Sequence, residues 1–370
     1  MKICLINNLY GENARGGAET VVKIIADGLK EKGHEVFVVS LNNFVPLNIC
    51  LYEDLSKHKM FFRLVWHIFD IFNLDGFFAI RKILKKEKVD IVWTHNLMGL
   101  GFLTPLVIKS LQIRHIHTLH DVQLSAPSGL IIKGKEKPVF GQKTYERICR
   151  ILFGSPAIVV SPSKWLMDFY TEKGFFLKSK RIVLQNPVQN LPSPEVSRNL
   201  LNILFLGQVE DHKGIIFSIN ALKKCQENFV FHIVGDGGKL EYIKKIIEGD
   251  RRFIVYGRKT GGDLEEIWKK INLTIVPSLC YENSPTVIFE SLNRQIPVLA
   301  SNIGGIPEIL LQVSPVDLRP REFLFETGDE KDFAEKIKWF LENKDRIKIN
   351  LLTKMLSASD FIDIIMEEIK

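Results

Sequence analysis

The stretch NPVQNLPSPEVSRN, residues 186–199, divides the chain into two parts that repeat one pattern. Its three prolines and several turn-forming residues can continue neither a strand nor a helix, so the stretch is predicted to be a linker. On both sides of it, short β-branched runs alternate with amphipathic segments, which is typical of βαβ units and parallel sheets. The sequence therefore predicts an α/β protein with two doubly wound, Rossmann-like domains that face each other across a cleft.

Short apolar runs in both parts are predicted to be strands. Those of the first domain, residues 1–190, are 2–7, 35–40, 90–94, 114–119, 157–161 and 181–185. Those of the second domain, residues 200–354, begin at Asn202, Phe229, Arg252, Leu273 and Pro297. Ligands of such sheets bind beyond the carboxyl ends of the strands, so functional residues are expected in the loops that follow strands.

The composition is that of an ordinary globular protein. The chain has 370 residues, of which 46% are hydrophobic and 25% charged, and this is enough for two cores. Its five cysteines are scattered without a C-x-x-C pair, which argues against a disulfide framework or a structural zinc site. No segment approaches the roughly 20 apolar residues of a transmembrane helix, and the first apolar run is too short for a signal peptide. We therefore expect a cytoplasmic protein.

The positive charge is concentrated in the first part of the chain. Residues 1–195 carry 26 Lys and Arg against 17 Asp and Glu, whereas the remainder carries 24 against 26. Within the first part, segment 58–88 combines aromatic and aliphatic residues with cationic ends. This composition suits peripheral contact with the anionic inner face of a membrane, but it also suits a pair of core helices with a solvated basic edge. No arginine-rich run or known reading motif predicts a nucleic-acid partner.

The stretch ENSPTVIFES, residues 282–291, places two glutamates in different elements. Ser284 precedes a proline and is steered away from the α region, while Pro285 suits the first position of a helix. Glu282 is therefore expected in a loop and Glu290 in the helix that follows. Both carboxylates are expected to face the same cleft.

Two further loops are candidates for binding an anion. Gly16 and Gly17, just before the first long helix, let the backbone approach a ligand and are expected to present unpaired N–H groups. Lys213 and Gly214 stand at the start of another helix, where a compact positive charge can lie beside a phosphate. A plain tight turn and a solvated lysine are the alternatives.

Motifs for a metal or a redox cofactor are missing from the sequence. The nine histidines form no H-E-x-x-H or comparable cluster, and no D-x-D occurs. No complete G-x-G-x-x-G follows the first strand, so a nicotinamide cofactor has little support. His120, at the end of a predicted strand, is either a ligand contact or a loop hydrogen-bonding residue. We expect neither a metal nor a cofactor.

Taken together, the ordered motifs resemble the retaining glycosyltransferases of family 4, which have the two-domain GT-B architecture. The resemblance covers nearly the whole chain, and the Glu-x7-Glu motif followed by Gly-Gly-x-Pro-Glu is its most specific part. The matching motifs are RGGAE (15–19), LHD (119–121), VSPSKW (160–165), QNPV (185–188), GQVEDHKG (207–214), VGDG (234–237), VPSLCYENSPTVIFES (276–291) and SNIGGIPEIL (301–310).

The resemblance implies a role for each candidate residue. Glu290 would bind the ribose hydroxyls of a nucleoside-diphosphate sugar, and Glu282 the hydroxyls of its sugar. Lys213 would neutralise the diphosphate, and His120 would contact the sugar near the reacting carbon. The remaining donor-binding residues would be Gly16 and Gly17, which close over the diphosphate, and the backbone amides of Asn283, Ser284 and Thr286. The last helix, within 355–370, would cross back onto the first domain.

One position departs from the resembled family, which usually has an arginine where this chain has Gln208. Losing a charged contact to the leaving group would cost about 2–4 kcal/mol of transition-state stabilisation. Arg15 and Arg258 are candidates to replace it.

The expected function is transfer of a sugar from a nucleoside-diphosphate sugar, such as a UDP-sugar, to a glycan or lipid-linked acceptor, with retention and without a metal. Such a reaction would belong to the biosynthesis of a cell-surface polysaccharide or glycolipid. A non-catalytic partner subunit on the same fold and a sugar-nucleotide epimerase or phosphorylase are the alternatives.

Overall fold

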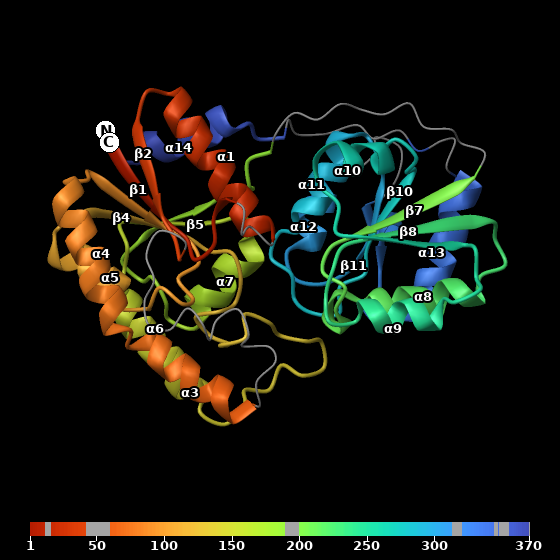
Figure 1. The fold of residues 1–370 in the computed structure, drawn as a ribbon, viewed down its shortest axis with the longest axis horizontal. Helices are drawn as coiled ribbons and strands as arrows, with labels where there is room; N and C mark the ends of the chain where they lie inside the picture. The colour runs from red at the N-terminus through yellow and green to blue at the C-terminus, as the bar shows by residue number, and fades with distance from the viewer. Residues whose placement is uncertain are drawn as a thin grey trace. The chain divides into compact units, whose positions relative to one another are not determined.

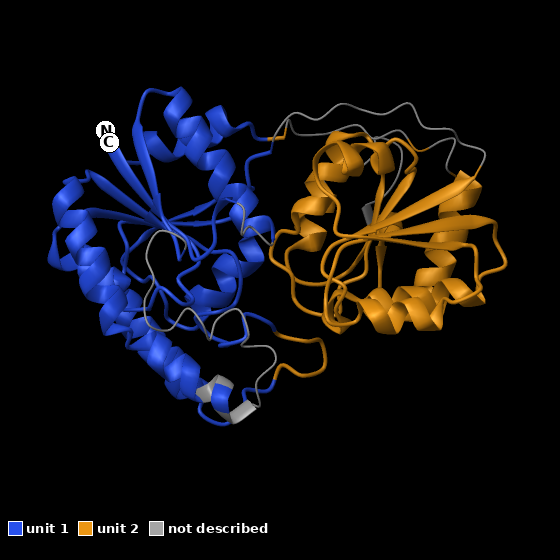
Figure 2. Cartoon of the chain, viewed as in Figure 1, with its two compact units in different colours: residues 1–130, 137–189, 356–370 blue, residues 131–136, 190–355 orange. Residues whose placement is uncertain are grey.

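The computed structural model describes residues 1–11, 16–41, 60–188, 200–312, 320–343, 347 and 355–369. The chain forms two compact units (Figure 2). Unit 1 contains residues 1–130, 137–189 and 356–370, and unit 2 contains residues 131–136 and 190–355. The short segment 131–136 therefore belongs to unit 2 although both of its neighbours along the chain belong to unit 1.

Unit 1 is built on a parallel sheet of six strands in the order β2-β1-β3-β4-β5-β6. Strands β3 and β5 are buried at every position, as expected for a parallel sheet covered by helices on both faces. All six strands predicted for the first domain are confirmed, with ends that differ by one or two residues. They are β1 (Lys2–Ile6), β2 (Glu35–Val39), β3 (Ile91–Thr94), β4 (Arg114–Thr118), β5 (Ile158–Ser161) and β6 (Lys180–Val183).

Seven helices of the described part of unit 1 surround this sheet (Figure 1). They are α1 (Gly17–Glu31), α3 (Met60–Ile71), α4 (Leu74–Glu87), α5 (Thr104–Ser110), α6 (Gln142–Phe153), α7 (Lys164–Glu172) and α14 (Ala358–Glu367). Helix α14 comes from the far end of the chain and packs against α1 and the sheet. Its Phe361 ring stacks on Trp93 of β3, with the ring centroids 6.1 Å apart.

Gly28 lets helices α1 and α14 approach closely. A Cβ atom at this position would lie 2.7 Å from Ile362 Cδ1 and 3.0 Å from the Ala358 Cβ. Both distances are shorter than ordinary contacts, so any larger residue would push α14 away from the core.

Unit 2 repeats the architecture with a parallel sheet in the order β12-β11-β10-β7-β8-β9. The five strands predicted for the second domain are confirmed, each beginning within one residue of its predicted start. They are β7 (Leu201–Leu206), β8 (Phe229–Val234), β9 (Phe253–Gly257), β10 (Leu273–Val276) and β11 (Val298–Ser301). The sixth strand, β12 (Leu324–Phe325), was not predicted. Its Phe325 packs between Phe217 and Phe333, with ring centroids 6.0 and 5.0 Å away.

The helical elements of unit 2 include two short 3₁₀ helices. In chain order, the helical elements are η3 (Asp211–Lys213), α8 (Ile215–Lys224), α9 (Leu240–Ile246), α10 (Gly261–Trp268), α11 (Thr286–Asn293), α12 (Ile306–Gln312), η4 (Pro320–Phe323) and α13 (Glu330–Asn343). Of these, η3 and η4 are the 3₁₀ helices. No helix in the described ranges is both long and apolar enough to cross a membrane. Of the predicted linker, residues 186–188 are described and the remaining ones lie outside the described residues; Val188 N–H donates to the Leu356 carbonyl at 3.0 Å.

The Gly28→Ala substitution is expected to destabilise the chain by about 1–2 kcal/mol, because overpacking against α14 outweighs the higher helix propensity of alanine. Urea unfolding measures this change. Ile362→Val removes the nearest atom, so the double variant should lose less stability than the sum of the single variants. A stabilising Gly28→Ala would show that the α1–α14 contact is not tight.

Candidate active site

The candidate site of unit 2 lies where the strand order of its sheet reverses. From β7 the chain moves outward through β8 and β9, and it then returns to the other side of β7 through β10, β11 and β12. Strands β7 and β10 are neighbours, and the loops that follow them lead away in opposite directions along the sheet. Doubly wound sheets bind ligands at such a point, beyond the carboxyl ends of the strands. Loop 207–214 carries Lys213, and loop 277–285 carries Glu282.

An ion pair joins these two loops. Lys213 Nζ lies 2.6 Å from Glu282 Oε1, and the same oxygen accepts a hydrogen bond from Ser278 Oγ at 2.9 Å. The side chains are only 27% and 14% exposed. Burial alone would raise the pKa of Glu282, but the Lys213 charge and the hydrogen bonds outweigh it and hold the pKa below its usual value. The Lys213 pKa is raised because the charge of Glu282 outweighs the effect of burial.

The backbone around this ion pair is tightly fitted. Gly214 has a φ of +74°, and a Cβ there would lie 1.8 Å from the Pro277 carbonyl oxygen. A Cβ at Gly304, in the loop after β11, would lie 2.2 Å from the Glu282 carbonyl oxygen, which accepts a hydrogen bond from Gly305 N–H at 2.8 Å. Only glycine allows either approach. Sequence reasoning had recognised the Gly-Gly motif of residues 304–305 but not its role in supporting Glu282.

Helix α11 carries Glu290 and begins at Thr286. The assignment of Glu282 to the loop and Glu290 to the helix is confirmed, but Pro285 is the residue before the helix and not its first member. The reason is its ψ of 118°, which is extended and not helical. Glu290 is largely buried, and burial raises the pKa of its carboxyl group against the opposing effect of Arg294.

Arg294 supports this helix and was not predicted as a site residue. Its side chain is 3% exposed, donates from Nη1 to the Glu290 carbonyl at 3.0 Å and pairs with Glu265. The guanidinium lies 4.7 Å from the Trp268 ring centroid, a cation–π contact. Its position four residues after Glu290 was the available signal, since residues with this spacing share one helix face.

The other predicted donor-binding residues of unit 2 lie in the same loops or at neighbouring strand ends. Asn283 is buried, and Ser284 Oγ is a buried atom without a hydrogen-bond partner among the described residues. Gln208 and Arg258 are exposed and follow β7 and β9. Arg15 lies outside the described residues. The roles assigned to all of these residues stay predictions.

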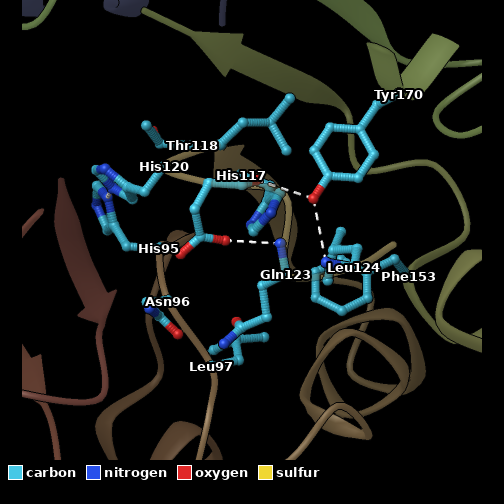
Figure 3. A pocket seen from close by; sticks show the side chains of 12 residues that line it. His95, Asn96, Leu97, His117, Thr118, His120, Gln123, Leu124, Phe153 and Tyr170 are labelled. Atoms are coloured by element: carbon cyan, nitrogen blue, oxygen red, sulfur yellow. Dashed lines mark hydrogen bonds between the residues drawn. The ribbon is translucent and has the colours of Figure 1, made fainter. Parts of the chain in front are cut away.

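In unit 1, His120 follows β4 and lines a pocket (Figure 3). His120 Nε2 lies 2.9 Å from His95 Nδ1, and burial lowers the pKa of His120 to about 4. Burial, followed by its histidine neighbours, also lowers the pKa of His95. Asp121, the next residue, accepts from Gln123 N–H at 2.8 Å, and burial raises its pKa to about 6. At neutral pH this pocket offers uncharged imidazoles.

The prediction of an unpaired amide at Gly16 is wrong. Gly16 is the N-cap of α1, and its N–H donates to Glu19 Oε2 at 2.8 Å in a capping box. A carboxylate of the chain itself thus already occupies the place that an anion would take at this amide. Among the residues that the structure describes, no group of three or more His, Cys, Asp or Glu side chains is arranged to hold a metal ion.

Two doubly wound units, one with an ion pair at its topological switch point, define the GT-B class of fold. The solved structure of HepE from Anabaena, in complex with UDP and glucose, matches with a TM-score of 0.70 and 17% identity, covering 100% of this chain and 99% of that chain.

Two sequence-family models match the chain. "Glycosyltransferase Family 4" matches residues 15–189, and "Glycosyl transferases group 1" matches residues 193–355. The chain belongs to the group 1 glycosyltransferases with the GT-B fold and is therefore a glycosyltransferase.

Two curated relatives extend the comparison. An uncharacterized protein of the cps region of Klebsiella pneumoniae is 27% identical over 334 residues, covering 84% of this chain and 87% of the relative. The UDP-Gal:alpha-D-GlcNAc-diphosphoundecaprenol alpha-1,3-galactosyltransferase of Escherichia coli is 26% identical over 260 residues, covering 63% of each.

Glu282→Gln is expected to lower the free energy of unfolding by about 1–3 kcal/mol near neutral pH. This loss is smaller than the loss for breaking a fully buried ion pair, because both side chains are partly exposed. The lowered pKa means that the carboxylate favours the folded state above its usual pKa of 4.5 and loses this effect as the pH falls through the folded-state value. Lys213, with its raised pKa, keeps its contribution at every pH below its usual 10.5. The difference between the two proteins should therefore shrink only below pH 4.5 in urea unfolding.

A matched control is Glu241→Gln, which removes a carboxylate that is 78% exposed in a surface pair. Its effect should be small throughout. A difference between Glu282→Gln and the unsubstituted chain that grows on acidification would contradict the sign of the Glu282 pKa shift.

Proposed function

We propose that the chain is a retaining, metal-independent glycosyltransferase that moves a sugar from a UDP-sugar to a glycan or lipid-linked acceptor. The observation that carries the proposal is the ion pair of Lys213 and Glu282 at the switch point of unit 2. The solved HepE structure supports UDP because it is a complex with UDP and glucose. The name of the Escherichia coli relative supports both a UDP-sugar and a diphosphate-linked lipid acceptor. The cps region of the Klebsiella relative supports a role in polysaccharide biosynthesis.

The ion pair suits the chemistry of a departing diphosphate. An ammonium group has three N–H donors, and Lys213 uses one of them on Glu282. The other two make no hydrogen bond to a described residue and can bind diphosphate oxygens, whose negative charge increases as the sugar–oxygen bond breaks. When the diphosphate replaces Glu282 as the partner of the Lys213 ammonium group, the Glu282 carboxylate becomes available to bind the sugar hydroxyls. Glu290 holds the ribose, and the backbone amides of Asn283, Ser284 and Thr286 assist Glu282 in binding the donor sugar.

Retention follows from a front-face reaction in which the leaving phosphate oxygen takes the proton of the acceptor hydroxyl. The acceptor then bonds to the anomeric carbon on the face that the diphosphate leaves. His120, uncharged at neutral pH because of its lowered pKa, assists by hydrogen bonding to the sugar and not as a cation. Because Gln208 is neutral, Arg15 or Arg258 supplies the positive charge that an arginine at position 208 would bring to the diphosphate.

Donor binding and turnover test this function. The purified chain should show a larger thermal shift with UDP-sugars than with GDP- or ADP-sugars. It should also transfer or slowly hydrolyse the UDP-sugar in the presence of EDTA, with a product anomer that matches the donor. Lys213→Ala should lower the rate by about 10²–10³-fold, because it removes a charge beside the leaving group.

The control is Lys239→Ala, which breaks an exposed ion pair with Asp211 in a neighbouring loop. An inverted product would refute retention, and inhibition by EDTA would refute metal independence. Failure to turn over any donor would favour the non-catalytic subunit. A new sugar nucleotide formed without an acceptor would favour the epimerase.

We further propose that α3 and α4 bring unit 1 to the anionic inner face of a membrane, where a lipid-linked acceptor is found. Six apolar side chains on and between these helices are 49–64% exposed, namely Phe62, Ile68, Phe69, Phe72, Leu74 and Phe78. Leu74 and Phe78 share one face of α4 with the exposed Lys82 and Lys85, because they are three or four residues apart. Aromatic side chains above a row of lysines are the composition of an interfacial helix.

The double variant Phe69→Ser/Phe78→Ser should bind vesicles of phosphatidylcholine and phosphatidylglycerol at least about tenfold more weakly, since each buried aromatic side chain contributes about 1.5–3 kcal/mol. Vesicle flotation at several salt concentrations measures this, and high salt should weaken binding. Tyr242→Ser/Leu311→Ser changes two side chains of unit 2 that are similarly exposed, at 50% and 55%, and serves as the control. Equal binding of the two double variants would refute the contact.

A further inference from the structure

Segment 131–136 adds a short strand to the loop that carries Glu282. Ile132 forms an antiparallel β-bridge with Cys280. The bridge is flanked by two hydrogen bonds, from Lys133 N–H to the Leu279 carbonyl at 3.0 Å and from Tyr281 N–H to the Ile131 carbonyl at 2.8 Å. These bonds fix the three residues that directly precede Glu282.

Side-chain contacts hold the same segment at two further points. Lys133 Nζ pairs with Glu326 and donates to the Thr327 carbonyl at 3.4 Å, in the loop after β12. Tyr281 Oη donates to Glu136 Oε1 at 3.2 Å. The segment is thereby joined to two loops of unit 2, and this explains why it belongs to that unit.

The hydrogen-bond pattern of the bridge places the side chains of Ile132 and Cys280 on the same face of the two paired strands. Hydrogen bonds that flank a pair, with none between its members, mark a narrow pair with Cα atoms about 4.5 Å apart and side chains on one face. Cys280 Sγ is 3.7 Å from Glu282 Oε1, the oxygen that also contacts Lys213 and Ser278. The Ile132 side chain therefore lies on the face of the Glu282 loop that is directed toward the ion pair.

We propose that segment 131–136 is a clamp that positions the Glu282 loop for the sugar of the donor, with its backbone bonds and Lys133 as positioning groups. The segment lies within residues 15–189, the range that the Family 4 model matches, although it belongs to unit 2 of the structure. This inference rests on the proposed function. It adds that binding of the donor's sugar, and not of its nucleotide, requires the clamp. The reason is that the clamp holds the loop of Glu282, which binds the sugar, and makes no described contact with Glu290, which binds the ribose.

The test compares UDP with UDP-sugar binding. Lys133→Pro removes the N–H of one bridge bond, and Lys133→Ala removes the ion pair. Both should weaken binding of the UDP-sugar about tenfold and lower its turnover, while binding of UDP alone changes less than twofold, as titration calorimetry can measure. Lys135→Ala changes an exposed lysine of the same segment and is the matched control. Equal losses for UDP and UDP-sugar, or no loss for either, would overturn the proposal.

A reversible staple makes the test independent of folding defects. A narrow antiparallel pair has the geometry for a disulfide, so Ile132→Cys can be oxidised onto the native Cys280 with glutathione disulfide, which accepts the two electrons. Burial raises the pKa of Cys280 to about 12, so oxidation will be slow and should be run for hours. In the Ile132→Cys/Lys133→Pro variant, oxidation should restore the affinity for UDP-sugar, and reduction by dithiothreitol should return it to the weak binding of the Lys133→Pro variant.

Oxidised Ile132→Ser/Lys133→Pro, which cannot form the bridge, is the control. A stapled protein that forms the disulfide but keeps the weak binding would overturn the clamp. A separate result, in which the unsubstituted chain binds no UDP-sugar at all, would instead count against the proposed function.

Discussion

The ion pair of Lys213 and Glu282 is the interaction on which the candidate site depends. It connects the loops of two neighbouring strands, β7 and β10, at the point where the sheet changes direction. Taking two charges out of water is costly, and the cost is offset only when each charge has further partners. Glu282 has them in Ser278 and Cys280, whereas Lys213 keeps donors for a ligand. Under the proposed function, an incoming diphosphate replaces the Glu282 carboxylate as the partner of the Lys213 ammonium group.

The position of Glu282 is held from several directions. The loop after β11 fixes its carbonyl through Gly305, the turn at Gly214 packs against Pro277, and segment 131–136 pairs with residues 279–281. Such preorganisation matters in catalysis because groups already in place need not reorganise as charge develops. Arg294 gives similar support to the helix of Glu290 through a backbone bond and its contact with Trp268.

The sequence predicted what is encoded locally and missed what depends on distant partners. Fully buried strands such as β3 and β10 are continuous apolar runs, and such runs can be read from the sequence. Strand β12 has two residues and depends on the packing of Phe325 between two other rings, so no run marked it. The capping box at Gly16 can be predicted from the glutamate three residues later, and it is incompatible with the prediction of an unpaired amide at Gly16. Segment 131–136 has two isoleucines followed by charged residues and one glycine, so it is too short an apolar run to predict a strand, and its partner Cys280 is far away in the sequence.

The candidate residues differ in whether they can supply positive charge to the diphosphate of the proposed donor. The histidines that line the pocket of unit 1 are buried and have lowered pKa values, so at neutral pH they contribute hydrogen bonds without charge. Gly16 cannot add a free amide, because Glu19 uses it. Under the proposed function, Lys213 and the exposed Arg258 are the described cations of unit 2 to which we assign the leaving group. Because residue 208 is a neutral glutamine, the proposed reaction depends more heavily on Lys213. The ion pair with Glu282, which positions Lys213, is then correspondingly more important for the proposed reaction.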